Sequence, residues 1–288
     1  ASRNAARRLR DAAFKVGFHM MPGQPGMTKS MCVEDFRQLF ENPDWRPDYL
    51  KIYPTLVVEG TRVYDRWRRD DFEPLSNEEA AEVVAEAMDH IPKYTRLQRV
   101  QRDIPADFIE GGVWKSNLRQ LADEQAEEKG IVQTDIRARE VGHNDADPDP
   151  DDVELDILTY EAGGGTEHFI SFEDPVRDLL VGFCRLRFPS FAPEQPGAPG
   201  TADDAVRREL EDAALVRELH VYGSEVAIGG DGDWQHQGYG RKLIERAEAL
   251  ARDAGYRKIA VISGIGARAY YRSKLGYHQD GPYVSKRL

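Results

Sequence analysis

The chain has 288 residues, of which 40% are hydrophobic and 31% charged, and its 51 acidic against 39 basic residues give a net charge of −12. This length suffices for two domains with separate cores. The apolar runs of the chain are shorter than the ~20 residues that span a bilayer. The acidity of the chain argues against indiscriminate nucleic-acid binding but not against a local basic groove. With only two cysteines it has no disulfide framework and no cysteine-only metal or iron–sulfur site, so we expect a cytoplasmic protein with no membrane contact and no DNA partner.

The first 110 residues alternate between predicted helices and strands. The basic N-terminus lacks the apolar segment of a secretory signal and predicts a helix that ends near Ala13. Strands are predicted at 15–21, 49–53 and 95–103, and helices at 33–40, at 64–68 and from the capping box at Ser76–Glu79 to about 91. Repeated strand–helix units are typical of a parallel α/β sheet or barrel. Three units cannot close an eight-stranded barrel, so we expect part of a larger domain that begins before this chain.

A connector and a second domain are predicted after this segment. A helix from Ser116 to Lys129 stops at Gly130, and the Asp- and Pro-rich run at 145–152 predicts an extended linker. A hairpin that turns at Gly163–Gly165 follows, then a strand at 179–188 and a loop at 189–204. The predicted organisation is therefore a partial barrel at 1–110, a connector at 111–152 and a second domain at 153–288.

The last 75 residues, roughly, contain the most informative motif, Gln235-His236-Gln237-Gly238-Tyr239-Gly240. Its glycines allow positive φ and close backbone approach, and a helix predicted at 241–254 adds the partial positive charge of its N-terminus, which favours a phosphate group. Taken alone, such a turn is equally compatible with an ordinary helix cap. Its neighbours are a strand at 214–222, a strand at 258–263, a short helix with Tyr270 and Tyr271, and a final strand at 282–287. This order of elements is that of the GNAT acetyltransferase core, whose cofactor is acetyl-CoA.

Motifs along almost the whole chain carry a closer resemblance. They lie at 18–26, 42–43 with 46–48, 51–57, 100–105, 137–142, 216–223, 235–240, 258–266 and 281–283. In these segments the chain resembles the catalytic subunit of Elongator in its archaeal form. The resemblance implies a radical S-adenosylmethionine (βα) barrel followed by a GNAT-like mixed α+β domain. It also implies transfer of a carboxymethyl-type group to the wobble uridine of tRNA, with acetyl-CoA and S-adenosylmethionine as cofactors.

Two departures from this family concern metals. The family's barrel binds a [4Fe–4S] cluster through a cysteine triad, whereas Cys32 and Cys184 are far apart and outside that motif. We therefore expect a truncated chain with only the later barrel strands, in which S-adenosylmethionine and the cluster belong to the intact protein alone. Gln133 stands where many members have a cysteine, and no metal ligand is predicted here.

The resemblance also implies the residues of the acetyl-CoA site. The backbone of Glu218, Leu219, His220 and Val221 is expected to contact the pantetheine and the thioester, and the pyrophosphate is expected on Gln237, Gly238, Tyr239, Gly240 and Arg241. Tyr271 or Tyr270 would donate a proton to the leaving thiolate, since a hydroxyl with a pKa near ~10 is a suitable acid. We expect one of the two tyrosines to be buried and the other exposed, with Tyr271 at the cofactor. His220 could act as a base, although a packed or solvent-facing role suits it equally.

Five arginines are candidates for tRNA contact, each equally compatible with plain solvation: Arg96, Arg99, Arg102, Arg137 and Arg139. Strict alternation along one strand would place Arg99 off the face of the other two strand arginines. The predicted function is that of a tRNA wobble-uridine acetyl or carboxymethyl transferase. One alternative is a protein lysine acetyltransferase with Glu218 as general base, and another is a non-catalytic tRNA-binding module. Self-association remains open.

Overall fold

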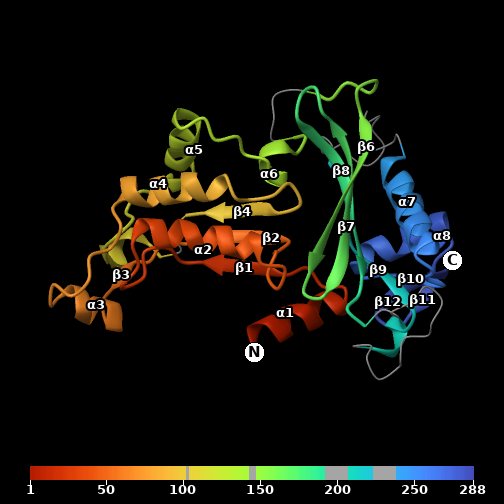
Figure 1. Cartoon of the computed structure of the whole chain (residues 1–288), viewed down its shortest axis with the longest axis horizontal. Helices are drawn as coiled ribbons and strands as arrows, with labels where there is room; N and C mark the ends of the chain where they lie inside the picture. Colours follow the sequence, from red (N-terminus) through yellow and green to blue (C-terminus); the bar gives the residue numbers. More distant parts are fainter. Residues whose placement is uncertain (102–103, 143–146, 192–206, 223–237) are drawn as a thin grey trace. The chain divides into compact units, whose positions relative to one another are not determined.

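The structure is a computed structural model that describes residues 1–101, 104–142, 147–191, 207–222 and 238–288. Within these residues the chain forms two compact units (Figure 1). The first consists of 17–42 and 46–138, and the second of 1–16, 43–45 and 139–288. The boundaries differ from those predicted, because the N-terminal helix belongs to the second unit and most of the predicted connector belongs to the first.

The first unit is built on a parallel three-stranded sheet in the order β1-β2-β4. Its sheet strands are β1 (Gly17–Met20), β2 (Tyr49–Ile52) and β4 (Arg96–Val100), and β3 (Val57–Val58) pairs with β5 (Ile109–Gly111). Its helices are α2 (Lys29–Glu41), α3 (Arg62–Trp67), α4 (Asn77–Met88) and α5 (Leu118–Glu128), and α6 (Ile136–Arg139) ends at the unit boundary. One face of the sheet is apolar, since Leu50, Ile52 and Leu97 are fully buried. In Figure 1 the helices α2 and α4 lie alongside these strands.

A β-bulge changes which side chains of β4 share a face. Tyr49 is paired with Arg96 and Leu50 with Leu97, but Lys51 is paired with Arg99, so Gln98 is an extra residue in β4. Tyr49 and Lys51 are two residues apart and point to the same side of the sheet. Arg96 and Arg99 therefore point to that side together. The predicted offset of Arg99 was wrong because strict alternation does not allow for a bulge.

Local sequence signals explain where the helices of this unit begin and end. The Ser76 hydroxyl accepts a hydrogen bond from the Glu79 backbone N–H, and the Glu79 carboxylate accepts one from the Ser76 N–H, which confirms the predicted capping box at the start of α4. After α5 the chain turns at Gly130, whose φ is +68°.

The second unit contains a seven-stranded sheet in the order β11-β12-β10-β9-β8-β7-β6 (Figure 1). Its strands are β6 (Glu154–Ala162), β7 (Gly165–Asp174), β8 (Leu179–Phe188), β9 (Ala213–Val221), β10 (Lys258–Val261), β11 (His278–Asp280) and β12 (Tyr283–Arg287), and its helices are α1 (Ser2–Asp11), α7 (Tyr239–Asp253) and α8 (Arg268–Leu275). Neighbouring strands are antiparallel except β9 and β10, which are parallel. The hairpin turns within the predicted Gly163–Gly165, where Gly163 and Gly164, both with positive φ, form the two-residue turn and Gly165 already belongs to β7.

The core of the second unit lies between the sheet and α7. Leu243, Ile244 and Ala247 of α7 are fully buried in one apolar cluster with Ile170 of β7 and Val216 of β9. Helix α1 joins this unit through charge, because its Asp11 is buried and paired with Arg187 of β8 at 2.6 Å. Among the residues that the structure describes, no helix has both the length and the apolar character of a membrane span.

Candidate functional site

Strands β9 and β10 are paired over only part of the length of β9. Their parallel register covers 213–216 and 258–261, and the Ile262 N–H donates to the Val216 carbonyl at 3.3 Å. Beyond that point β9 continues to Val221 beside β8. Arg217 is an extra residue opposite β8, since Leu186 is paired with Val216 and Arg185 with Glu218. The bulge lies where the two parallel strands part, just after Val216 of β9.

A cavity of about 410 Å³ lies where the strands part. Its lining is contributed by β9, by the residues after β10, by α8 and by the segment that follows α1. These residues are Arg217–His220, Ile262–Gly264 with Ala267, Tyr271, and Phe14 with Lys15. Three of the predicted cofactor contacts on β9, Glu218, Leu219 and His220, thus meet Tyr271 at one cavity.

The start of α7 brings the glycine turn to the end of β9. Gly238 is the N-cap, is exposed and has a φ of +75°, a conformation that favours glycine. A β-carbon on Gly240 would lie 3.7 Å from Val221 and 3.5 Å from the Tyr270 hydroxyl. The N–H groups at this N-terminus are suited to an anion. Gln237, with the first half of the motif, lies outside the described residues.

The side chains of Tyr239 and Arg241, next to this turn, differ in exposure. Tyr239 is buried, and its ring packs 4.8 Å from Phe172, so it could meet a cofactor only through its backbone. Arg241 is exposed, and its Nη2 donates to the Lys274 carbonyl at 3.4 Å. A guanidinium there remains available to a phosphate.

The two adjacent tyrosines of α8 differ in exposure, as predicted. Tyr271 is 5% exposed and lines the cavity, whereas Tyr270 is 38% exposed. Burial raises the pKa of Tyr271 well above its ordinary value of 10.0. Its hydroxyl therefore stays protonated at neutral pH, which is the form that a proton donor needs.

Glu218 is held between two cations. Its carboxylate accepts hydrogen bonds from Lys15 Nζ at 2.8 Å and from Arg185 Nε at 2.9 Å. Burial alone would raise the pKa of Glu218, but the charges of Arg185 and Lys15 outweigh it and lower the pKa below 4.5. A general base works best with a pKa near the working pH, so this environment makes Glu218 a poor base.

His220 is exposed at the edge of the cavity. Its ring lies 4.3 Å from Tyr222 and stacks 6.1 Å from Phe183. The ring is thus part of an aromatic cluster and also next to the cavity, which is consistent with either of the roles considered for it.

The predicted RNA-binding arginines lie in different surroundings. Arg96 and Arg99 share one face of β4, with Arg99 exposed, and Arg137 is half-buried. Arg139 is 5% exposed and is paired with Glu173 and Asp178, both at 2.6 Å. This guanidinium stabilises the fold of the second unit, so the structure does not support its predicted contact with tRNA. Arg102 lies outside the described residues.

Both cysteines are buried. Cys184 is fully buried in the core and Cys32 is 1% exposed, with its sulfur accepting the Gly23 N–H at 3.2 Å. Within the described part of the chain, no group of three or more His, Cys, Asp or Glu side chains is arranged for a metal ion. Gln133 is bonded to Arg119 and Asp123.

The sequence did not identify several groups at the cavity. Phe14 and Lys15 are some 200 residues from β9, and no local pattern connects them with it. Ser263 could have been found, because it follows the end of β10, where a parallel strand commonly presents site residues. Its hydroxyl is buried and has no hydrogen-bond partner in the described structure.

Comparison with known families agrees with this architecture. Residues 47–128 match the Radical_SAM C-terminal domain, and residues 133–277 match the Acetyltransferase (GNAT) family. The chain is 46% identical to the tRNA uridine(34) acetyltransferase of Methanocaldococcus infernus, over 99% of this chain and 52% of that protein. It is 43% identical to Elongator complex protein 3 of Saccharomyces cerevisiae, over 97% of this chain and 49% of that protein.

A solved structure gives the same result. It is the archaeal Methanocaldococcus infernus Elp3 with an N-terminal deletion, at a TM-score of 0.88 and 44% identity, covering 100% of this chain and 66% of that one. The chain spans about half the length of the curated relatives it matches. Its fold is the predicted one, the later part of a radical S-adenosylmethionine domain with an acetyltransferase domain. The chain therefore belongs to the GNAT family of acetyltransferases, as a homologue of the archaeal tRNA uridine(34) acetyltransferases and of Elongator complex protein 3.

Proposed function

We propose that this chain binds acetyl-CoA at the parting of β9 and β10 and supplies its acetyl group for modification of the wobble uridine of tRNA. The observation that carries the proposal is the cavity of about 410 Å³ bounded by β9 and Tyr271, in the same unit as the glycine N-cap of α7. The pantetheine would lie along the backbone of 218–221, and the pyrophosphate would lie on the N–H groups of Gly238 to Arg241. The names of the relatives supply the tRNA substrate.

Tyr271 is the residue we assign to proton transfer. Tyr271 lines the cavity, where the thioester sulfur would lie, and its hydroxyl is protonated. When the carbon–sulfur bond breaks, the thiolate needs a proton, and this hydroxyl would donate it. Tyr270, which is more exposed, would contact the cofactor from outside the cavity.

The residues of this chain do not fit the [4Fe–4S] cluster that the family resemblance implies. A [4Fe–4S] cluster requires several cysteine thiolates, whereas the chain has only Cys32 and Cys184, which are buried and belong to different units. We therefore assign the cluster and S-adenosylmethionine to the intact protein and derive no step from them here. Candidate tRNA contacts on this chain are Arg96, Arg99, Arg102 and Arg137. Both cysteines are free, which supports the cytoplasm as the location.

Calorimetric titration of the chain with acetyl-CoA tests the proposal. We expect saturable binding at one site, and absence of binding would overturn the assignment. The chain by itself is not expected to modify uridine in tRNA. Robust modification without another protein would contradict the proposal that the cluster and S-adenosylmethionine are needed and are bound elsewhere.

The paired state of Glu218 weighs against the alternative of a protein lysine acetyltransferase. That reaction needs a base for the lysine amine, and Glu218 is held ionised with a lowered pKa. Acetyl-CoA turnover can be measured with added tRNA and with added lysine peptides. We expect a response to tRNA, and a response to the peptides alone would favour the alternative.

A further inference from the structure

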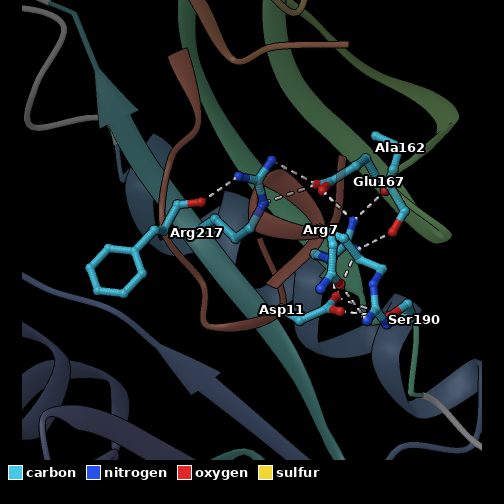
Figure 2. Close-up of polar contacts among 10 residues, drawn as sticks. Arg7, Asp11, Ala162, Glu167, Ser190 and Arg217 are labelled. Carbon is cyan, nitrogen blue, oxygen red and sulfur yellow. Dashed lines mark hydrogen bonds and ion pairs between the residues drawn. The ribbon is translucent and has the colours of Figure 1, made fainter. Parts of the chain in front are cut away.

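Two arginines and two carboxylates alternate in the interior of the second unit. Asp11, Glu167, Arg187 and Arg217 are each at most 2% exposed. Arg187 contacts Asp11 at 2.6 Å and Glu167 at 2.9 Å, and Arg217 contacts the other oxygen of Glu167 at 3.0 Å (Figure 2). We call these four residues the buried charge cluster. Each charge has an opposite partner, which buried ions require.

The cluster extends to the segment that follows α1. Arg217 Nη1 donates to the Phe14 carbonyl at 2.9 Å, in addition to its bonds to Glu167. The next residue, Lys15, donates to Glu218 at 2.8 Å. Two consecutive residues of β9 thus hold two consecutive residues of this segment, and all four line the cavity.

The segment needs such support because it has no regular structure of its own. Phe14 and Lys15 belong to neither a helix nor a strand, and Phe14 is 48% exposed. Ala13, just before them, has a φ of +67°, a left-handed conformation that costs an alanine about 1–2 kcal/mol. The cap of α1 imposes it, since the Phe14 N–H donates to the Leu9 carbonyl at 2.9 Å, and beyond this bond the segment is held by its contacts with β9.

Two further side chains, Ser190 and Arg7, connect the buried charge cluster to α1. The Ser190 hydroxyl donates to Asp11 Oδ2 at 2.6 Å, and Arg7 Nη1 donates to the same hydroxyl at 3.1 Å (Figure 2). Asp11 is the last residue of α1, so its position determines where the chain leaves the helix.

We propose that the buried charge cluster positions Phe14 and Lys15 as one wall of the acetyl-CoA cavity, so that acetyl-CoA affinity depends on residues that never touch the cofactor. Asp11, Glu167 and Arg187 are positioning residues in this sense, since none of them lines the cavity. The inference rests on the proposed binding of acetyl-CoA at this cavity.

The test compares two buried carboxylates of the same unit. Glu167→Gln removes a charge of the cluster at nearly constant size. Glu173→Gln removes the carboxylate that pairs with Arg139 at 2.6 Å and lines no part of the cavity. Acetyl-CoA affinity is measured by calorimetry, stability by thermal unfolding, and the placement of the wall by the rate of tryptic cleavage after Lys15.

We expect Glu167→Gln to weaken acetyl-CoA binding about fivefold or more and to accelerate cleavage after Lys15. Glu173→Gln should lower stability but leave both the affinity and the cleavage rate unchanged. Equal affinities in the two variants, whether both unchanged or both reduced alike, would overturn the proposal.

Ser190→Ala provides a milder variant should Glu167→Gln fail to fold. It removes one hydrogen bond to Asp11 and leaves all four buried charges in place. We expect a smaller loss of affinity in the same direction with faster cleavage after Lys15, and no change in either would overturn the positioning role. An unmodified chain that binds no acetyl-CoA would instead overturn the proposed function, and the inference with it.

Discussion

Gly238 and Gly240 lie two residues apart at the start of α7, yet an added methyl group would meet different conditions at each position. Gly238 has a φ of +75° with nothing within 4 Å of an added β-carbon, so alanine there is strained but not crowded. At Gly240 the β-carbon would make ordinary contacts with Val221 and the Tyr270 hydroxyl. Alanine substitutions at the two glycines therefore test two effects separately, the stability of the turn at Gly238 and the access of a cofactor to the turn at Gly240.

We predict that Gly238→Ala lowers the free energy of unfolding by about 1–2 kcal/mol, the cost of a left-handed alanine. Gly240→Ala should leave stability unchanged or raise it by up to about 1 kcal/mol, since alanine suits a helix better than glycine. Its methyl group should nevertheless weaken acetyl-CoA binding by about 1 kcal/mol or more. Urea unfolding and calorimetry measure the two effects, and unchanged affinity in both variants would favour the non-catalytic module.

Which site residues could be predicted from the sequence depends on how far apart the interacting residues are along the chain. The glycine turn and the paired tyrosines are short motifs, and their positions were predicted. The partners of Glu218 were not, because Lys15 is 203 residues away and Arg185 is on a neighbouring strand. The burial of Arg139 depends in the same way on Glu173 and Asp178, which only the folded sheet brings close.

At the scale of elements, the hairpin of β6 and β7 contains one buried ionisable side chain in a cross-strand pair. Thr159 is paired with His168, and their side chains share a hydrogen bond of 2.9 Å at Nδ1. The other ring nitrogen, Nε2, is buried and has no partner in the described structure. Burial lowers the pKa of His168 below 6.5, against the weaker opposing effect of Glu167 and Glu161.

This pair predicts a pH dependence of stability. As the pH falls below the pKa of an unfolded histidine, near ~6.5, His168 becomes protonated in the unfolded chain but stays neutral in the folded one. The free energy of unfolding therefore drops by up to about 1.4 kcal/mol per pH unit until the pH reaches the pKa of His168 in the folded state. Urea unfolding between about pH 7 and pH 5.5 measures the slope. His168→Phe should reduce it, whereas His278→Gln on the exposed strand β11 should not. Identical slopes in all three proteins would contradict the prediction.

Elements with strong local signals were predicted well, and irregular ones were not. The capping box of α4, the glycine hairpin and the limits of β8 follow from residues within each segment. The bulges at Gln98 and Arg217 arise from the partner strand, so they have no signature in their own segment. Strand β11 was missed because its three residues are too few to show a period.

For the whole molecule, the division into two units predicts a local response to the cofactor. A ligand that binds only the folded state stabilises it by about 2.7 kcal/mol at one hundred times its dissociation constant. We predict that acetyl-CoA slows amide hydrogen exchange in β9 and α7, which surround the site, and leaves β1, β2 and β4 of the other unit nearly unchanged. Exchange measured by mass spectrometry with and without acetyl-CoA tests this, and equal protection of both units would contradict it.

The acetyltransferase unit is also discontinuous in sequence. The family match begins at residue 133, yet the unit includes residues 1–16, which provide the partner of Arg187 and a wall of the cavity. No single cut in the gene separates the two units, because the chain leaves one, enters the other and returns twice. A recombination event that exchanged only the region matched by the family would leave Arg187 without Asp11. An acetyltransferase domain transplanted as residues 133–277 alone would therefore contain a buried arginine without its carboxylate partner.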